Sequence, residues 1–382
     1  MNLAIIRPFA NILSDEKYNV QEFGLAKALV KQNINVDVFC AGAKPMAEIN
    51  ELCGEMDCRA RIIRMPFYTM FSYHGIFKGL FNLLKEKEYN IIQTQGYEQI
   101  TSFLATWFGV KHSIPVVLHQ GVYETDYGVK LGSIMRVFHL TLGKYMRRNI
   151  SGCITKTDKA KEFLERKGFN NIETIPIGLD IEKFKPSVKA DWKSKLCLKP
   201  SDRLLLYVGI IEPRRNVDFL INIIYLLEKM GEPVNLLIAG TGPDEKKCKK
   251  KVEELNLTKK VFFLGRLAQT ELSSLYSDAD LFVLPSNNEI VGMVLLESLY
   301  FGLPVLTTPT AGGLDIVNES NGKIFSELNE KKWVDFICDY FNDPDKYGFK
   351  KYLTQHPFER SWNTLGQRYA FFYQNVVDGY VT

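Results

Sequence analysis

Short apolar runs alternate with amphipathic segments along the first half of the chain. Runs such as 3–6 and 35–40 suit buried strands, while 20–31 has the spacing of an amphipathic helix. A strand, helix, strand order of this length predicts a βαβ unit with a parallel sheet, and strands this apolar predict a sheet covered on both faces. Further strands are expected at 61–65, 90–94, 115–119, 151–155 and 172–176, and further helices at 76–85, 100–108 and 131–148.

The same alternation starts again near residue 204, after a stretch of different character. Residues 181–200 hold six lysines and two prolines with little periodicity, which is typical of a linker between domains. We therefore expect a first domain at 1–180, the linker at 181–200, a second domain at 201–360 and a final helix at 361–382. In the second domain, strands are expected at 204–209, 235–240, 261–265 and 281–284, and helices at 217–230, 245–255 and 270–276.

Composition narrows the class of protein. The 382 residues are two to three times the length of a typical domain, which favours two domains. Lys+Arg 48 against Asp+Glu 44 gives a net charge of +4, too mild to indicate nucleic acid as the main partner. The seven cysteines form no C-x-x-C pair, which favours a reducing compartment. Without a signal peptide or a membrane-spanning apolar run, the protein is expected to be cytoplasmic, at most peripheral at the inner face of a membrane.

The stretch 285–298 carries the strongest candidate chemistry. It follows the apolar run 281–284 and leads into a helix, so Glu289 lies in a loop and Glu297 lies about two turns further on in the helix. Ligands of open α/β sheets bind at this carboxyl edge of the strands. Unpaired N–H groups of Gly292, Met293 and Val294 at the helix start would suit a phosphate. The plainer alternative is two solvated glutamates that favour the helix dipole by only ~0.3–1 kcal/mol each.

The run Glu-x7-Glu, followed by Gly302-Leu303-Pro304-Val305 and Ala311-Gly312-Gly313, resembles the donor-sugar signature of retaining GT-B glycosyltransferases of family four, the glycosyl transferases group 1. The resemblance implies an α/β fold of two doubly wound, Rossmann-like domains facing across a cleft. The first domain would serve the acceptor, the second would bind the nucleotide sugar, and the helix 361–382 would cross back to the first domain.

The resemblance also implies an activity. We expect a retaining, metal-independent hexosyltransferase with no cofactor, whose co-substrate is a nucleotide diphosphate sugar, with UDP favoured over GDP. The acceptor would be a glycan or a lipid-linked molecule used in cell-surface polysaccharide or glycolipid synthesis. Two alternatives stay open: a sugar-nucleotide-binding partner subunit that has lost catalysis, and another GT-B enzyme such as a nucleotide-sugar epimerase.

Roles follow for individual residues. In the resembling family the second glutamate, here Glu297, holds the ribose, and the first, Glu289, lies beside the transferred sugar. Arg215 stands where the family has a phosphate-binding lysine, and His119 at a strand end would lie close to the sugar. The expected catalytic residues are His119 and Glu289; the expected donor-binding residues are Glu297, Arg215, Arg214, Gly209, Gly292, Met293, Val294, Gly240 and Gly242; none is expected to bind a metal.

Some features depart from the pattern or carry weaker signals. The family commonly has arginine where this chain has Ile210, and Gly-Gly in the first loop, near Asp15-Glu16-Lys17 of this chain. Asp278-x-Asp280 has the form of a metal motif, but it stands where the family has an acidic residue entering a strand. Residues 76–85 and 135–148 mix apolar and basic side chains as a membrane-surface helix would, although ordinary packing explains them equally well.

Overall fold

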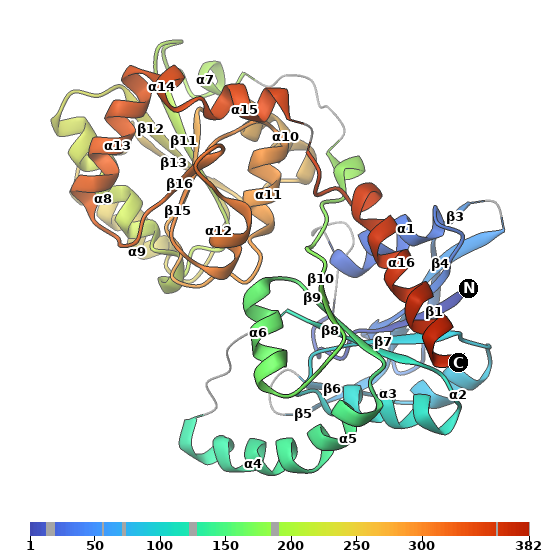
Figure 1. Cartoon of the computed structure of the whole chain (residues 1–382). Coiled ribbons are helices and arrows are strands. Elements are labelled where there is room, and N and C mark those ends of the chain that lie inside the picture. Colours follow the sequence, from blue (N-terminus) through green and yellow to red (C-terminus); the bar gives the residue numbers. More distant parts are fainter. Residues whose placement is uncertain are drawn as a thin grey trace. The chain divides into compact units, whose positions relative to one another are not determined.

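The computed structural model describes residues 1–12, 20–55, 57–70, 74–121, 128–184, 191–356 and 358–381 (Figure 1). The chain folds into two compact units. Unit 1 comprises Met1–Leu179 and Arg360–Thr382, and unit 2 comprises Asp180–Glu359. No helix among the described residues has the length and apolar character needed to cross a membrane.

Unit 1 is built on a sheet with the strand order β10-β9-β8-β7-β1-β2-β4-β3, in which only the β3–β4 pair is antiparallel. Its strands are β1 (Asn2–Ile6), β2 (Asn35–Ala41), β3 (Glu48–Glu55), β4 (Cys58–Met65), β7 (Ile91–Gln95), β8 (Val116–Gln120), β9 (Gly152–Thr155) and β10 (Ile172–Thr174). Its helices are α1 (Gln21–Val30), α2 (Leu80–Lys85), α3 (Ile100–Lys111), α4 (Gly128–Leu140), α5 (Leu142–Asn149), α6 (Asp158–Arg166) and α16 (Trp362–Val381). The central strands β7 and β8 are buried at every position, as a sheet covered on both faces requires.

The final helix α16 packs against α1, so the two ends of the chain share one unit (Figure 1). Two glycines let the helices come close. A Cβ on Gly24 would lie 2.1 Å from the Trp362 indole nitrogen, and one on Gly366 would lie 2.8 Å from Cβ of Ala28. Deeper in the unit, the Tyr373 hydroxyl donates to the Gln93 side chain. One side of helix α16 is therefore part of the core of unit 1.

Unit 2 has a fully parallel sheet in the order β13-β12-β11-β14-β15-β16. Its strands are β11 (Arg203–Val208), β12 (Val234–Ala239), β13 (Val261–Gly265), β14 (Leu281–Leu284), β15 (Val305–Thr307) and β16 (Gly322–Ile324). Its helices are η1 (Ile181–Lys183), α7 (Trp192–Lys195), η2 (Pro213–Arg215), α8 (Val217–Lys229), α9 (Glu245–Glu254), α10 (Gln269–Asp278), α11 (Met293–Tyr300), α12 (Ala311–Ile316), α13 (Glu330–Asn342), α14 (Pro344–Tyr347) and α15 (Phe349–Gln355). The strand order reverses between β11 and β14, which puts the switch point of this doubly wound sheet there.

Two expected helices of unit 1 differ from the prediction. Instead of a helix over 76–85, strand β6 (His74–Phe77) pairs with β5 (Phe67–Met70), and the helix begins only after Gly79, whose φ of 75° is left-handed. Instead of one helix over 131–148, α4 and α5 are separated at Thr141, whose ψ of −88° is not helical.

Residues 181–200 lie in unit 2, where the expected linker forms contacts of its own. Asp191 accepts a hydrogen bond from the Ser194 amide and so caps the short helix α7. The Trp192 indole N–H donates to the Ser274 hydroxyl of α10 over 3.0 Å. Residues 185–190 of the expected linker lie outside the described residues.

Candidate functional site

Two loops meet at the switch point of unit 2 because β11 and β14 are neighbours whose connections leave in opposite directions. The loop after β11 reaches α8, and the loop after β14 reaches α11. The Asn287 amide donates to the Arg214 carbonyl over 2.8 Å, and the Asn216 side chain donates to the Pro285 carbonyl over 2.7 Å. These bonds hold the two loops together as one platform at the carboxyl edge of the sheet.

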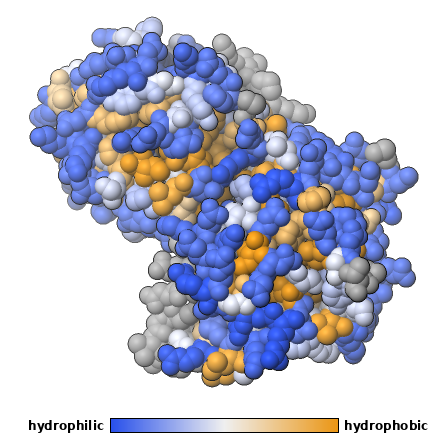
Figure 2. All heavy atoms as spheres, viewed as in Figure 1, coloured by the Kyte–Doolittle hydropathy of each residue, from blue (hydrophilic) through white to orange (hydrophobic). Residues whose placement is uncertain are grey.

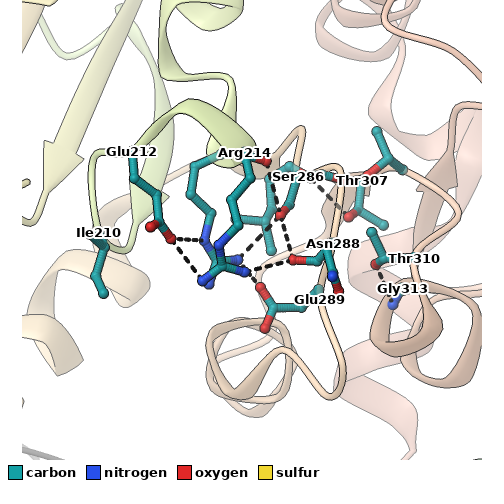
Figure 3. A network of polar contacts seen from close by, with 12 residues as sticks. Ile210, Glu212, Arg214, Ser286, Asn288, Glu289, Thr307, Thr310 and Gly313 are labelled. Atoms are coloured by element: carbon teal, nitrogen blue, oxygen red, sulfur yellow. Dashed lines mark hydrogen bonds and ion pairs between the residues drawn. The ribbon is translucent and has the colours of Figure 1, made fainter. Parts of the chain in front are cut away.

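Four charged side chains form a cluster on this platform (Figure 3). Arg215 is ion-paired through Nη1 with Glu289, from the other loop, and both side chains are largely shielded from solvent. Glu212 Oε1 lies 2.7 Å from Arg214 Nη2 and 3.7 Å from Arg215 Nε. The two arginines and two glutamates therefore balance one another in charge. The structure brings together Glu289, Arg214 and Arg215, which the sequence had singled out.

Polar groups around Ser286 fix the arginine positions. The Ser286 hydroxyl accepts from Arg215 Nη1 over 3.3 Å, and the Asn288 carbonyl accepts from Arg214 Nη1 over 3.0 Å. A third loop adds support, because the Thr308 hydroxyl donates to the Ser286 carbonyl. The cluster thus rests on the loops that follow β11, β14 and β15.

Gly312 sets the shape of the loop that carries Glu289. Its amide donates to the Glu289 carbonyl over 2.9 Å. A Cβ at this position would lie 2.4 Å from the Val291 carbonyl oxygen, closer than real Cβ contacts allow. Only glycine lets α12 approach this loop so closely, which gives the Ala-Gly-Gly part of the signature a physical reason.

The start of helix α11 offers backbone donors beside the cluster. Gly292 takes a φ of 70° at the N-cap, a conformation that glycine adopts readily. Among the described residues, no backbone carbonyl accepts from the N–H groups of Gly292, Met293 or Val294. Such donors at a positive helix end favour an anion.

Glu297 lies on the same helix but is only 6% exposed. Its Oε2 accepts a hydrogen bond of 2.8 Å from the buried Tyr276 hydroxyl. Burial raises the pKa of Glu297 to about 7, although the hydrogen bond from Tyr276 and the nearby Gln269 side chain act in the opposite direction. The Tyr276 ring stacks on Phe301 at 5.6 Å, which fixes the hydroxyl toward the carboxyl group. Glu297 is therefore a preorganised, partly satisfied hydrogen-bonding group.

The glycines of the β11 and β12 loops have a structural reason of their own. A Cβ on Gly240 would lie 1.9 Å from the Gly209 carbonyl, and one on Gly242 would lie 2.2 Å from the Ile211 carbonyl. The close approach of the two loops explains these glycines without a ligand. Ile210, between them, has 53% of its surface exposed.

His119 lies in unit 1, at the end of β8, and is 4% exposed. Its Nε2 lies 3.4 Å from the Tyr369 hydroxyl of α16, and its Nδ1 has no hydrogen-bond partner among the described residues. Burial lowers the pKa of this imidazole well below its ordinary value, and nearby Lys156 acts in the same direction. The ring is therefore neutral at pH 7.

Asp278 and Asp280 lie just before the start of β14, at the opposite end of the strand from the carboxyl edge. Asp278 accepts from the Trp192 amide over 3.0 Å, and Asp280 accepts from the Leu204 amide over 2.9 Å. Asp280 also lies 3.4 Å from Arg203 Nη1. Both carboxylates thus join local elements. Asp15, Glu16 and Lys17 of the first loop lie outside the described residues.

Comparison with known families agrees with this geometry. Residues 23–183 match Glycosyltransferase Family 4, and residues 188–352 match Glycosyl transferases group 1. The chain belongs to the group 1 glycosyltransferases of family 4. This glycosyltransferase is 28% identical over 262 residues to the alpha-monoglucosyldiacylglycerol synthase of Streptococcus pneumoniae, a match that spans 64% of the chain and 58% of that relative.

Solved structures share the fold of this glycosyltransferase. Sucrose-phosphate synthase of Thermosynechococcus elongatus is similar with a TM-score of 0.71 and 19% identity, and the match covers 99% of both chains. Anabaena Alr3699/HepE in complex with UDP is similar with a TM-score of 0.75 and 15% identity over 98% of this chain and 100% of that one. The predicted GT-B fold class, with two Rossmann-like parallel α/β domains, is confirmed.

Three residues of the candidate site were not predicted from the sequence. Glu212 joins both arginines, Ser286 accepts from Arg215, and Tyr276 bonds to Glu297. Glu212 was visible in the sequence three residues before Arg215, an i,i+3 ion-pair spacing. Tyr276 carried no such signal because it reaches Glu297 from another helix, 21 residues earlier.

Proposed function

We propose that this glycosyltransferase is a retaining, metal-independent hexosyltransferase that uses a nucleotide diphosphate sugar, with UDP favoured as the nucleotide. The observation that carries the proposal is the platform at the β11–β14 switch point. There Arg215 lies beside the start of α11, whose first N–H groups have no backbone acceptor among the described residues, and the same helix carries the buried Glu297. Cations and amide donors there suit a diphosphate, and a carboxylate suits two ribose hydroxyls. Alr3699/HepE, of the same fold, was solved with UDP, which supports the choice of nucleotide.

Each residue has a proposed task. Arg215, assisted by Arg214 and the amides of Gly292, Met293 and Val294, stabilises the negative charge that grows on the leaving diphosphate. Glu297 accepts hydrogen bonds from the ribose, and Glu289 contacts the transferred sugar. From the resemblance, His119 remains a proposed contact of the sugar, acting as a neutral hydrogen-bonding group.

The proposed acceptor is a hydroxyl of a glycan or a lipid-linked molecule. The Streptococcus pneumoniae relative is named as a synthase of a glucosyl lipid, which supports this class of acceptor.

A thermal-shift panel tests the donor assignment. UDP, GDP, ADP and their hexose conjugates are added with and without EDTA, since a ligand at 100 times its Kd stabilises the fold by about 2.7 kcal/mol. We expect a shift with UDP ligands that survives EDTA. A shift that requires added Mg²⁺ would contradict metal independence, and no shift with any nucleotide would contradict the donor site.

The anomeric outcome tests the reaction class. With a UDP-α-hexose that binds and an acceptor that turns over, ¹H NMR of the product should show an α linkage. A β linkage would contradict retention. Tight nucleotide binding without transfer to any acceptor would instead favour a binding subunit. The first variant to test for restored transfer would then be Ile210→Arg, because Ile210 is exposed and the family commonly has arginine there.

A further inference from the structure

We propose that the outer faces of α3, α4 and α5 form a docking surface for a membrane that carries anionic lipids. This surface belongs to unit 1 alone and does not depend on the proposed donor chemistry. It is defined by seven side chains: Trp107, Val110, Lys111, Arg136, Val137, Leu140 and Lys144, with Arg148 at its edge.

The apolar part of the surface has no partner within the described residues that would cover it. On α4, Val137 is 61% exposed and Leu140 is 69% exposed, whereas Phe138 between them is buried in the core of unit 1. At 100° per residue, Val137 and Leu140 lie on one side of the helix and Phe138 on another. Trp107 and Val110, three residues apart on α3, are also exposed.

The charged part of the surface has one sign. The sequence contains no aspartate or glutamate from 99 to 121 or from 127 to 157, the segments that contain all three helices. Lys144 and Arg148 are one turn apart on the exposed side of α5, opposite the buried Met146. Arg136 lies beside Val137 and Leu140, and the Lys111 ammonium lies 5.2 Å from the Trp107 ring centre.

Helix α5 joins the other two helices of this surface. Helix α5 packs against both α3 and α4, and the Phe103 and Tyr145 rings meet edge to face at 5.6 Å. Figure 1 shows α4 and α5 following one another along the lower edge of unit 1, and Figure 2 shows apolar and hydrophilic residues interspersed along the coloured part of that edge. The core beneath them, which includes Tyr97, Phe138 and Met146, holds the helices in place.

The positive charge of this surface indicates which partner it binds. Exposed aliphatic and indole groups enter the boundary between headgroups and acyl chains, while lysine and arginine on the same face attract anionic headgroups. An acidic protein could form ion pairs with the lysines and arginines. Its binding would not explain why two aliphatic side chains, Val137 and Leu140, are so exposed. Residues 76–85, by contrast, do not add a helix to this surface, because 74–77 form a strand and Leu80 and Leu84 are buried.

Vesicle flotation of the full chain tests the proposal. The vesicles are phosphatidylcholine alone, or with about one third phosphatidylglycerol so that the surface is anionic. We expect binding to the anionic vesicles only, and its loss at 0.5 M salt, where the Debye length falls to a few ångströms. Binding of equal strength to both vesicles, or to neither, would overturn the proposal.

Three double variants separate the contributions. K144Q/R148Q should weaken binding to anionic vesicles by ~30-fold, from about 1 kcal/mol per basic residue. V137S/L140S should weaken it at least ~10-fold with no change in net charge. K249Q/K250Q on α9 of unit 2 removes the same charge from exposed lysines and should leave binding unchanged.

Two readouts decide between a membrane and other partners. Circular dichroism and the UDP thermal shift should be unchanged in all three variants, so that a failure of donor binding is distinct from a failure of docking. If K249Q/K250Q weakens binding as much as K144Q/R148Q, the attraction is diffuse and the proposal is wrong. If V137S/L140S instead abolishes self-association in sedimentation velocity without changing flotation, the surface joins two copies of the chain, and the proposal is equally wrong.

Discussion

The Arg215 guanidinium is ion-paired with the Glu289 carboxylate across the two loops of the switch point. The cation that we propose for the diphosphate is therefore already paired with a carboxylate. In the function that we propose, a diphosphate takes the place of Glu289 on Arg215, and this exchange releases Glu289 to meet the sugar. Such an exchange would couple nucleotide binding to the position of a proposed catalytic carboxylate.

Glu289→Gln should raise the affinity for UDP while it lowers sugar transfer. The amide has the same size but no longer competes for Arg215, so the Kd for UDP should fall roughly tenfold, equal to ~1.4 kcal/mol. Isothermal titration calorimetry measures this change. Glu254→Gln, on the exposed α9 face, is the matched control for charge. Unchanged or weaker UDP binding in Glu289→Gln would show that the pair does not compete with the phosphate.

Glu297 should make the stability of the chain depend on pH. Its pKa is about 7 in the folded chain against an ordinary value of 4.5, so the folded state holds the proton more tightly than the unfolded state. The stabilising contribution is present below pH 4.5 and is lost as the pH rises through about 7, by on the order of 3 kcal/mol at most. Urea unfolding from pH 5 to pH 8 should show this fall in the wild type and a smaller one in Glu297→Gln. Parallel curves would contradict the shifted pKa.

Nucleotide binding should release a proton from the same residue. The ionised carboxylate accepts hydrogen bonds only, so ribose hydroxyls should favour it over the protonated form. Below pH 7 we expect weaker UDP binding, with proton release that calorimetry detects by comparing buffers of different ionisation enthalpy. Glu297→Gln should bind UDP at least ~10-fold more weakly and release no proton, given the strength of charge-assisted bonds. Proton release that persists in this variant would assign the titration elsewhere.

Tyr276→Phe should raise the pKa of Glu297 without removing a group that we propose to contact the ligand. Its hydroxyl donates to Glu297 Oε2 and so lowers the pKa of that carboxyl group. Removing the hydroxyl should move the pH midpoint of UDP binding upward and cost ~1–2 kcal/mol of stability for the lost buried bond. Tyr340→Phe, in α13, removes a buried hydroxyl with no hydrogen-bond partner among the described residues and is the control. An unmoved midpoint would contradict the role of Tyr276.

Gly312→Ala should disrupt the loop that carries Glu289. The new methyl group would meet the Val291 backbone, which can yield only if the loop moves, at a cost of about 1–3 kcal/mol. We expect a lower Tm and weaker UDP binding. Gly379→Ala near the end of α16 meets no atom within 4 Å and is the control. If Gly312→Ala binds UDP as well as the wild type, the close approach of α12 has no part in shaping the site.

His119→Phe tests the proposed sugar contact. Phenylalanine can keep the packing against Tyr369 but cannot offer a ring nitrogen. We expect the Tm to stay within a few degrees of the wild type and transfer to fall ~100-fold, the lower end of the range for a lost hydrogen-bonding or acid–base group. A large fall in Tm with transfer per folded molecule unchanged would restrict His119 to packing. UDP affinity is the internal control, because the nucleotide platform lies in unit 2.

The sequence alone determined the fold class and the location of the candidate site. Short apolar runs of strand length have few alternatives to a buried parallel sheet, and the spacing of Glu289 and Glu297 after such a run places both at the carboxyl edge. These conclusions depend on the local spacing of apolar and polar residues, which can be read from one sequence. The same reasoning failed at residues 76–85, where the apolar pattern was satisfied by a hairpin and a short helix instead.

Only the tertiary structure decided which side chains of the candidate site contact one another. The pairing of Arg215 with Glu289 follows from the adjacency of β11 and β14, strands separated by more than seventy residues of chain. The bond from Tyr276 to Glu297, and the burial that raises the pKa of that carboxyl group, depend on which helices pack together. The glycines at 240 and 242 likewise owe their place to a neighbouring loop. Local spacing cannot specify such contacts, because the free energy that forms them comes from packing between distant segments.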